Sequence, residues 1–232
     1  MPYSEKSSNV DTYQRHKARF VELLDAHVGT PLLQLDIPGF AIWDIPTTTL
    51  SHLTHIGVHN AYGMHLIGVL FQCCPSLESL SIHSVRGKQE SKELASALAA
   101  QPDAAPRLTH LKVHIFGIDY ATWAKKIAPF LRAKKRLRCL DWFERQTDVT
   151  KLGPFLSVLT SLPHLEALGF AISCDVSTVL GSGMLNRYIP KHLKALRLLL
   201  APNAAASSRD THLDVSINTL VCPVGARGID CI

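Results

Sequence analysis

The sequence predicts an α/β fold, a solenoid with parallel strands on its concave side and helices on its convex side. Two observations predict it. One short phrase, with apolar residues at its first, fourth and sixth positions, recurs seven times along the 232 residues, and a segment with helical periodicity follows most copies. The copies begin at Leu32, Leu53, Leu77, Leu108, Leu137, Leu165 and Leu193.

The phrase suits a strand, because its apolar residues alternate and are rich in branched or aromatic side chains. Successive copies begin 21 to 31 residues apart. This spacing is close to the roughly 20–29 residues of a leucine-rich repeat, in which each unit combines a strand with a helix. One unit cannot bury both of its apolar faces, so neighbouring units stack. We therefore expect about seven irregular repeats.

Helices are expected between the strands, and proline leads from most of them into the next strand. Pro75, Pro106, Pro163 and Pro190 each stand just before a copy of the phrase. Proline lacks an N–H group and favours an extended residue before it, so it ends the preceding helix. The expected helices cover residues 62–74, 90–100, 120–131, 151–162 and 176–188.

The two ends of the chain are expected to differ from the repeats at 51–200. Residues 1–50 would contain a polar tail, an amphipathic capping helix at 12–27 and the first strand, which together seal the first repeat. After residue 200 the pattern decays. Residues 201–232 are therefore expected to be weakly structured, with a last weak strand at 213–220.

A doubly wound parallel sheet is the alternative fold. Its strands are buried on both faces, and a glycine-rich loop usually follows the first strand. Here the residues between the leucines are mostly polar, and the sequence Gly181-Ser182-Gly183 falls inside an expected helix. The repeat period therefore favours the solenoid.

Composition excludes several functional classes. The formal net charge of +5 is small and specifies no partner, and the basic residues do not form a nucleic-acid footprint. Six cysteines at irregular spacings, without a C-x-x-C pair, predict reduced thiols. No apolar run approaches the ~20 residues of a membrane helix. We therefore expect a cytoplasmic or nuclear protein without a cofactor and without a membrane partner.

Two phrases resemble the repeats of a known family. Residues 74–82 and 162–170 contain the pattern P-x-L-E-x-L, which restarts each irregular repeat in fungal F-box/leucine-rich-repeat proteins. The resemblance implies a substrate-recruiting surface of a ubiquitin ligase. The 31 residues before the first repeat lack the Leu-Pro-x-Glu opening of an F-box, so a ligase adaptor subunit is not an expected partner. A degenerate relative that has lost both the F-box and its partner is a further interpretation.

The concave face is expected to carry the third, fifth and seventh residues of each phrase, because the first, fourth and sixth point inward. His59, His83 and His114 then occupy one position in three successive strands, about 5 Å apart. His55 and His110 flank a serine in a parallel column. We expect this face to bind a protein partner. The candidate contact residues are His55, His59, His83, His110, Lys112, His114, Asp141 and Phe143.

The second half of this face, from Cys139 to Leu199, is expected to be small or apolar. An exposed apolar patch often marks an interface. The C-terminal residues could equally fold over it.

The histidines also suggest a metal-assisted enzyme, because imidazole nitrogens bind metals such as zinc. Their columns contain no supporting carboxylate or cysteine pair, so no metal site is predicted. Cys73 and Cys74 are interpreted as core residues without a nearby catalytic base. No catalytic residue is therefore predicted.

A basic run crosses one expected helix end and the following turn. Cations suit a helix C-terminus, so a solvated turn is favoured over a nuclear-import or acidic-partner site. The run consists of Lys125, Lys126, Arg132, Lys134, Lys135, Arg136 and Arg138.

Overall fold

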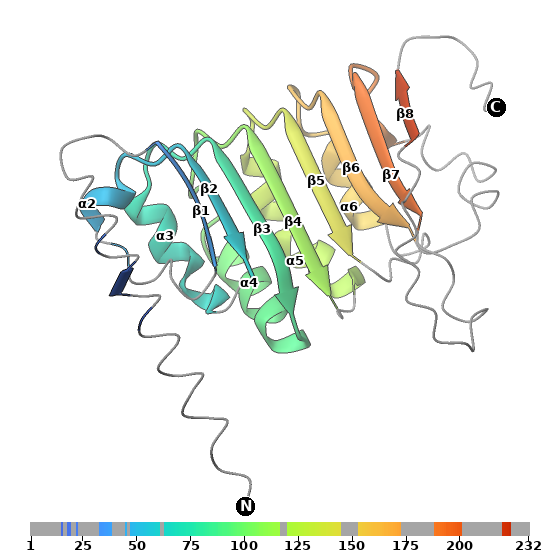
Figure 1. Cartoon of the computed structure of the whole chain (residues 1–232). Coiled ribbons are helices and arrows are strands. Elements are labelled where there is room, and N and C mark those ends of the chain that lie inside the picture. The colour runs from blue at the N-terminus through green and yellow to red at the C-terminus, as the bar shows by residue number, and fades with distance from the viewer. Residues whose placement is uncertain are drawn as a thin grey trace, which may run out of the picture.

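The computed structural model describes residues 15, 18–19, 22, 33–38, 45, 47–60, 63–116, 120–144, 153–172, 188–200 and 220–223. The strands within these ranges form a single sheet, in which they lie side by side in sequence order (Figure 1). The strands from β1 to β7 are parallel, and β8 joins β7 in the antiparallel direction. The strands are β1 (Gln34–Pro38), β2 (His55–His59), β3 (Ser79–Arg86), β4 (His110–Phe116), β5 (Cys139–Glu144), β6 (Ala167–Ile172), β7 (Ala195–Leu200) and β8 (Leu220–Pro223).

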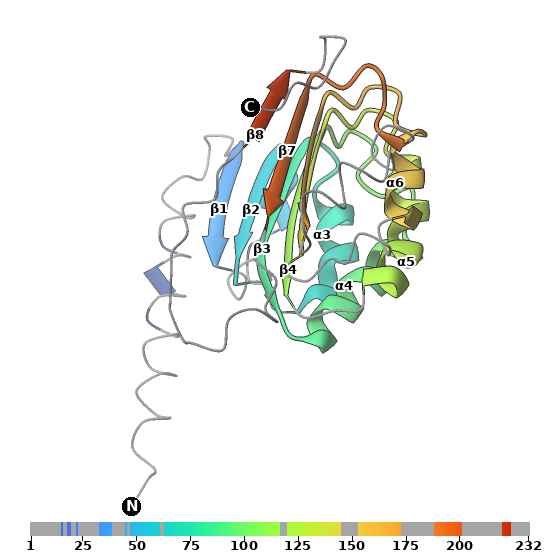
Figure 2. The same ribbon diagram turned by 90° about the vertical axis from the view of Figure 1, so that its right-hand side faces the viewer.

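Helices α3 to α6 cover one face of the sheet (Figure 2). We call the opposite face, which none of these four helices covers, the open face. Within the described residues, no helix has both the length and the apolar character that a membrane span requires. The helical segments are α2 (Thr47–Leu50), the 3-10 turn η2 (Met64–Leu66), α3 (Ile67–Cys73), α4 (Lys88–Ala100), α5 (Tyr120–Ala133) and α6 (Gly153–Leu159).

The core lies between the sheet and these helices. In β2 and the turn before it, the first, fourth and sixth residues of the phrase, Leu53, Ile56 and Val58, are fully buried. Each such side chain contributes about 1.5–3 kcal/mol by leaving water. The predicted inward positions are buried in the same way from Leu35 to Leu193, whereas Leu196 in β7 is only partly buried. The α/β class is confirmed.

Strands β2 to β7 are each preceded by the same turn. The N–H group of the first leucine donates to the carbonyl three residues earlier, as in Leu77 to Cys74 (3.2 Å) and Leu108 to Ala105 (3.1 Å). The carbonyl of the second phrase residue then accepts two N–H groups from the next unit. This repeated bonding aligns the units in register.

The topology does not match the doubly wound alternative. That fold reverses its strand order at one point and places helices on both faces. Among the described strands the order has no reversal.

Element ends differ modestly from the predictions. The helix expected from residue 62 is described from Met64 as a 3-10 turn, after Gly63 in the left-handed conformation (φ 68°). Helix α4 begins at Lys88, two residues earlier than predicted. Helix α6 is shorter than the expected 151–162. Of the last strand expected at 213–220, only Leu220 lies within the described residues, where it begins β8.

Two predicted helices lie mostly outside the described residues. Of residues 12–27 the structure describes Arg15, Ala18, Arg19 and Glu22, which are helical and exposed. Of residues 176–188 it describes only Tyr188, so the Gly181-Ser182-Gly183 segment is also outside the described part.

Lys134 corrects the interpretation of the basic run as a solvated turn. Its side chain is 1% exposed. Its ammonium donates to the carbonyls of Pro102 (2.7 Å) and Ala104, and lies 4.1 Å from the centroid of the Phe130 ring. Burial lowers the Lys134 pKa to about 8. Lys134 therefore links the end of α5 to the turn after α4 through its hydrogen bonds. The other six residues of the run are exposed.

Candidate functional site

A column of aromatic rings crosses the open face. The rings of His59 and His83 stack with centroids 4.8 Å apart. His83 and His114 meet edge to face at 4.9 Å, and His114 meets Phe143 in the same way at 4.7 Å. The prediction that the three histidines follow one another across successive strands is therefore confirmed, and Phe143 extends their column.

Strand β3 contains a β-bulge next to His83, a member of this column. Pairing between β3 and β4 passes from Ile82 opposite Val113 to Val85 opposite Ile115, so β3 contains one extra residue. Such a bulge bends the strand locally and re-aims a side chain. Val85 is fully buried beyond the bulge, so the inward alternation resumes there.

The first end of the column is a contact between a histidine and a carboxylate. Asp36 Oδ1 in β1 lies 2.6 Å from Nε2 of His59. The Asp36 carboxylate reaches across Gly57, where an added Cβ would collide with it. Glycine at this position therefore allows the contact between Asp36 and His59.

His114 is uncharged near neutral pH. Burial lowers its pKa to about 4, and the nearby His83, Lys112 and Arg197 act in the same direction. Burial also lowers the pKa of His83, and the nearby Lys112 lowers it further. The buried Nε2 of His114 has no hydrogen-bond partner within the described structure. The middle of the column therefore contributes ring surface and no positive charge.

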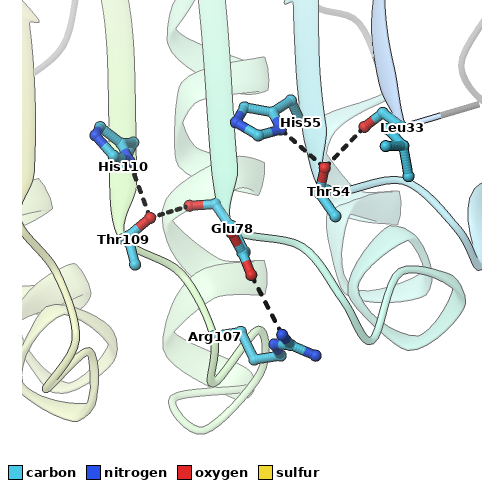
Figure 3. Close-up of polar contacts among 7 residues, drawn as sticks. All are labelled: Leu33, Thr54, His55, Glu78, Arg107, Thr109 and His110. Atoms are coloured by element: carbon cyan, nitrogen blue, oxygen red, sulfur yellow. Dashed lines mark hydrogen bonds and ion pairs between the residues drawn. The ribbon is translucent and has the colours of Figure 1, made fainter.

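A second column contains two matching threonine–histidine pairs (Figure 3). The Thr54 hydroxyl donates to the carbonyl of Leu33 (3.0 Å) and lies 2.8 Å from His55 Nδ1. The Thr54 hydroxyl thus contacts both the His55 ring and a carbonyl of the preceding unit, which holds the ring in one orientation.

The same arrangement recurs in β4. Thr109 Oγ1 donates to the Glu78 carbonyl (2.9 Å) and lies 2.9 Å from His110 Nδ1. The register places Ser79 between His55 and His110, as predicted. Two strand spacings separate the histidines by about 10 Å. The recurring Thr-His dipeptide was the sequence signal for this pair, and the role of its threonines was missed.

Lys112 and Asp141 occupy the fifth phrase position in β4 and β5, next to Ser81 and Gly169 respectively. Both side chains are half-buried. Burial raises the pKa of Asp141, opposed by Arg197 and then Lys112. The Asp141 carboxylate lies over Gly169, where a Cβ would collide with it. Among the described residues, neither Lys112 nor Asp141 forms an ion pair within 4.0 Å.

Phe143 corrects the expectation of an exposed contact residue. Its side chain is only 6% exposed. The ring packs against His114, and the guanidinium carbon of Arg197 lies 5.4 Å from its centroid. Phe143 is therefore a buried packing residue beneath the open face and not an exposed contact residue. The side chains of Ala171 and Leu199, predicted to extend this apolar half, lie outside the described part.

The described residues contain no group of three His, Cys, Asp or Glu residues that could hold a metal ion. Burial raises the pKa of Cys74 to about 12 and that of Cys139 to about 11, which keeps both thiols protonated. Cys74 lies in the core, as predicted, and Cys73 is half-buried.

Comparisons with known proteins do not identify a relative. No protein-family model matches the chain, and no curated protein matches it. The resemblance to fungal F-box/leucine-rich-repeat proteins therefore depends on the two phrases at residues 74–82 and 162–170 alone.

Proposed function

We propose that the chain is a leucine-rich-repeat solenoid that binds a protein partner on its open face and catalyses no reaction. Three features support the solenoid: the sequential strand order, the turn repeated before β2 to β7, and the helices α3 to α6 on one face. In this arrangement the open face is the concave face.

The observation that carries the binding proposal is the alignment of polar side chains on β2, β3 and β4. His55 and His110 are exposed on either side of the half-buried Ser79, and Lys112 lies in the next column. The backbone ladder and the threonine contacts hold the two histidines in place before binding. A preorganised surface loses less conformational entropy on association.

The resemblance to F-box repeats suggests the biological class of the partner. A substrate of a ubiquitin ligase is the partner that this resemblance implies. A ligase adaptor subunit recovered together with the chain would support that class. A stable complex without any ligase component would instead support a separate interaction module.

Site-specific crosslinking tests the proposed face. A photoreactive residue replaces Gln34, which is exposed in β1 beside His55, or Lys92, which is exposed on α4. We expect irradiation in cells to yield one discrete protein adduct from position 34 and none from position 92. An adduct from position 92 alone would place the interface on the helical side and overturn the proposal.

The captured partner then allows a direct affinity measurement. Replacing His55 and His110 by alanine should weaken binding about tenfold, because two preorganised hydrogen-bonding groups are lost. His164→Ala is the matched control, since His164 is an exposed histidine in the turn before β6. Equal affinities for the double variant and the control would exclude these two residues as contacts.

A further inference from the structure

The carboxylates around the polar part of the open face are already engaged. Asp36 pairs with His59 at 2.6 Å, and Glu78 pairs with Arg107 at 3.3 Å. Farther along the sheet, Glu166 contacts Arg138 and Lys194 at 2.9 and 3.1 Å. Asp141 lies over Gly169 on the side away from β4. Each of these acids is therefore held by, or directed toward, groups of this chain.

Lys112 on β4 makes no such close contact. It is half-buried, and within the described residues it has no carboxylate within 4.0 Å. Asp141 stands opposite Lys112 in β5, but its carboxylate lies over Gly169 in β6. A half-buried ammonium loses hydration that a close ion pair would replace. Lys112 can therefore pair with a further carboxylate.

We propose that Lys112 receives a carboxylate from an acidic segment of the protein partner. This inference rests on the proposed function and specifies the chemistry of the partner. The hydroxyl-bearing Ser81 lies opposite Lys112 in β3, and Ser79 lies opposite His110. These half-buried side chains can donate hydrogen bonds to an incoming carboxylate.

The charge balance favours a carboxylate over a phosphate. His83 and His114 are uncharged near pH 7, because burial and Lys112 itself lower the pKa of both. Lys112 and Arg197 are two cations that act on the single carboxylate of Asp141, opposite Lys112 in β5, so this part of the face keeps a net charge of about one. A carboxylate matches that charge, whereas a phosphate monoester carries about −1.5 to −2 at pH 7.

Fluorescence anisotropy with the purified full chain tests the proposal. The probe is a fluorescein-labelled octapeptide of alternating glycine and glutamate, compared with the glutamine and phosphoserine versions at fixed ionic strength. We expect the glutamate peptide to bind about tenfold more tightly than the glutamine peptide. Lys112→Gln should weaken binding of the glutamate peptide about fivefold, and Lys112→Arg should retain most of it.

Lys126→Gln is the matched control, because it removes one positive charge from the exposed surface of α5. Less than twofold weakening in this variant would support a specific site. Equal weakening by Lys112→Gln and Lys126→Gln would show attraction to net charge alone and overturn the proposal. Tighter binding of the phosphoserine peptide would overturn the choice of carboxylate.

The same measurement separates the failure of this inference from failure of the proposed function. Absence of binding to the glutamate peptide overturns the acidic-partner proposal. If crosslinking at position 34 still captures a protein, the open face remains the interface, and its partner has another chemistry. Circular dichroism of each variant confirms that the fold is retained.

Discussion

The two halves of the open face use the same strand positions differently. On β2 to β4 the seventh phrase position is always histidine, and the third is histidine in β2 and β4; of these residues His55, His59 and His110 are exposed. On β5 the seventh position carries Phe143, which is buried. A residue's place in the repeat therefore determines its face, and its neighbours determine whether it is available to a partner.

The neighbours differ mainly in size. Around Phe143 the next strand offers Gly169, which leaves room for the ring and for the carboxylate of Asp141 to lie close to the sheet. Around His59 the next strand offers His83, whose ring stacks on it and leaves its other surface accessible. Small residues on β6 thus create a supporting region, and rings on β2 to β4 create an exposed one.

The largest effect is expected when the ring of Phe143 is removed and the loss of stability is compared with that from removing the ring of His59. Phe143→Ala should lower the free energy of unfolding by about 3 kcal/mol, since a buried ring leaves a cavity. His59→Ala should cost under about 1 kcal/mol, because the His59 side chain is 48% exposed. Denaturant unfolding at pH 7 measures both values. Equal losses would remove the distinction between support and contact.

The next test concerns His114, where the two halves meet. Its pKa of about 4 in the folded chain lies below the ordinary 6.5, so the unfolded chain binds this proton first as the pH falls. The stability associated with neutral His114 is complete above pH 6.5 and is lost between pH 6.5 and 4, by about 2–3 kcal/mol. Unfolding measured across this range in the wild type and in His114→Phe should show a shallower pH dependence for the variant, which keeps an aromatic ring. An unchanged slope would assign the acid sensitivity to other groups.

A smaller effect is expected at the two glycines of the fifth position. Gly169→Ala should lower the free energy of unfolding by about 1–2 kcal/mol, because both Asp141 and the buried Phe143 must shift. Gly57→Ala should cost about 0.5 kcal/mol, since only the exposed Asp36 must move. Thermal unfolding of the two variants makes the comparison. A greater loss at Gly57 would contradict the assignment of β6 as the supporting region.

The smallest stability change is expected in the exposed histidine pair. Replacing His55 and His110 by alanine should change the free energy of unfolding by less than about 0.5 kcal/mol per site, as for other surface residues. Denaturant unfolding provides the measurement. A larger loss would show that the threonine–histidine contacts stabilise the fold, and partner-binding data from that variant would then need a milder substitution.

Several features of this face could be predicted from the sequence because they depend on local periodicity. The alternation of inward and outward residues placed His59, His83 and His114 in one column, and the repeat spacing placed Ser79 between His55 and His110. Other features depend on groups distant in the chain. Phe143 and Lys134 were misjudged because a side chain's exposure depends on what the neighbouring units place beside it.

The threonine contacts show the same limit at the level of single atoms. The Thr-His dipeptides are visible in the sequence, but each threonine hydroxyl donates to a carbonyl that the preceding unit places beside it. The β3 bulge likewise follows from pairing with β4. A linear pattern has no information on such partners.

The sequence by itself determined the α/β class, the order of strand and helix, and the face to which each phrase position belongs. These properties follow from the period of two residues in a strand and from the length of each unit. Only the tertiary structure decided which outward residues are available, which are buried, and which charges are paired. Those properties arise from contacts between units that lie about 20 to 30 residues apart in the chain. The size and charge of the side chains on one strand determine how much room, and which electrostatic environment, the side chains on the next strand have.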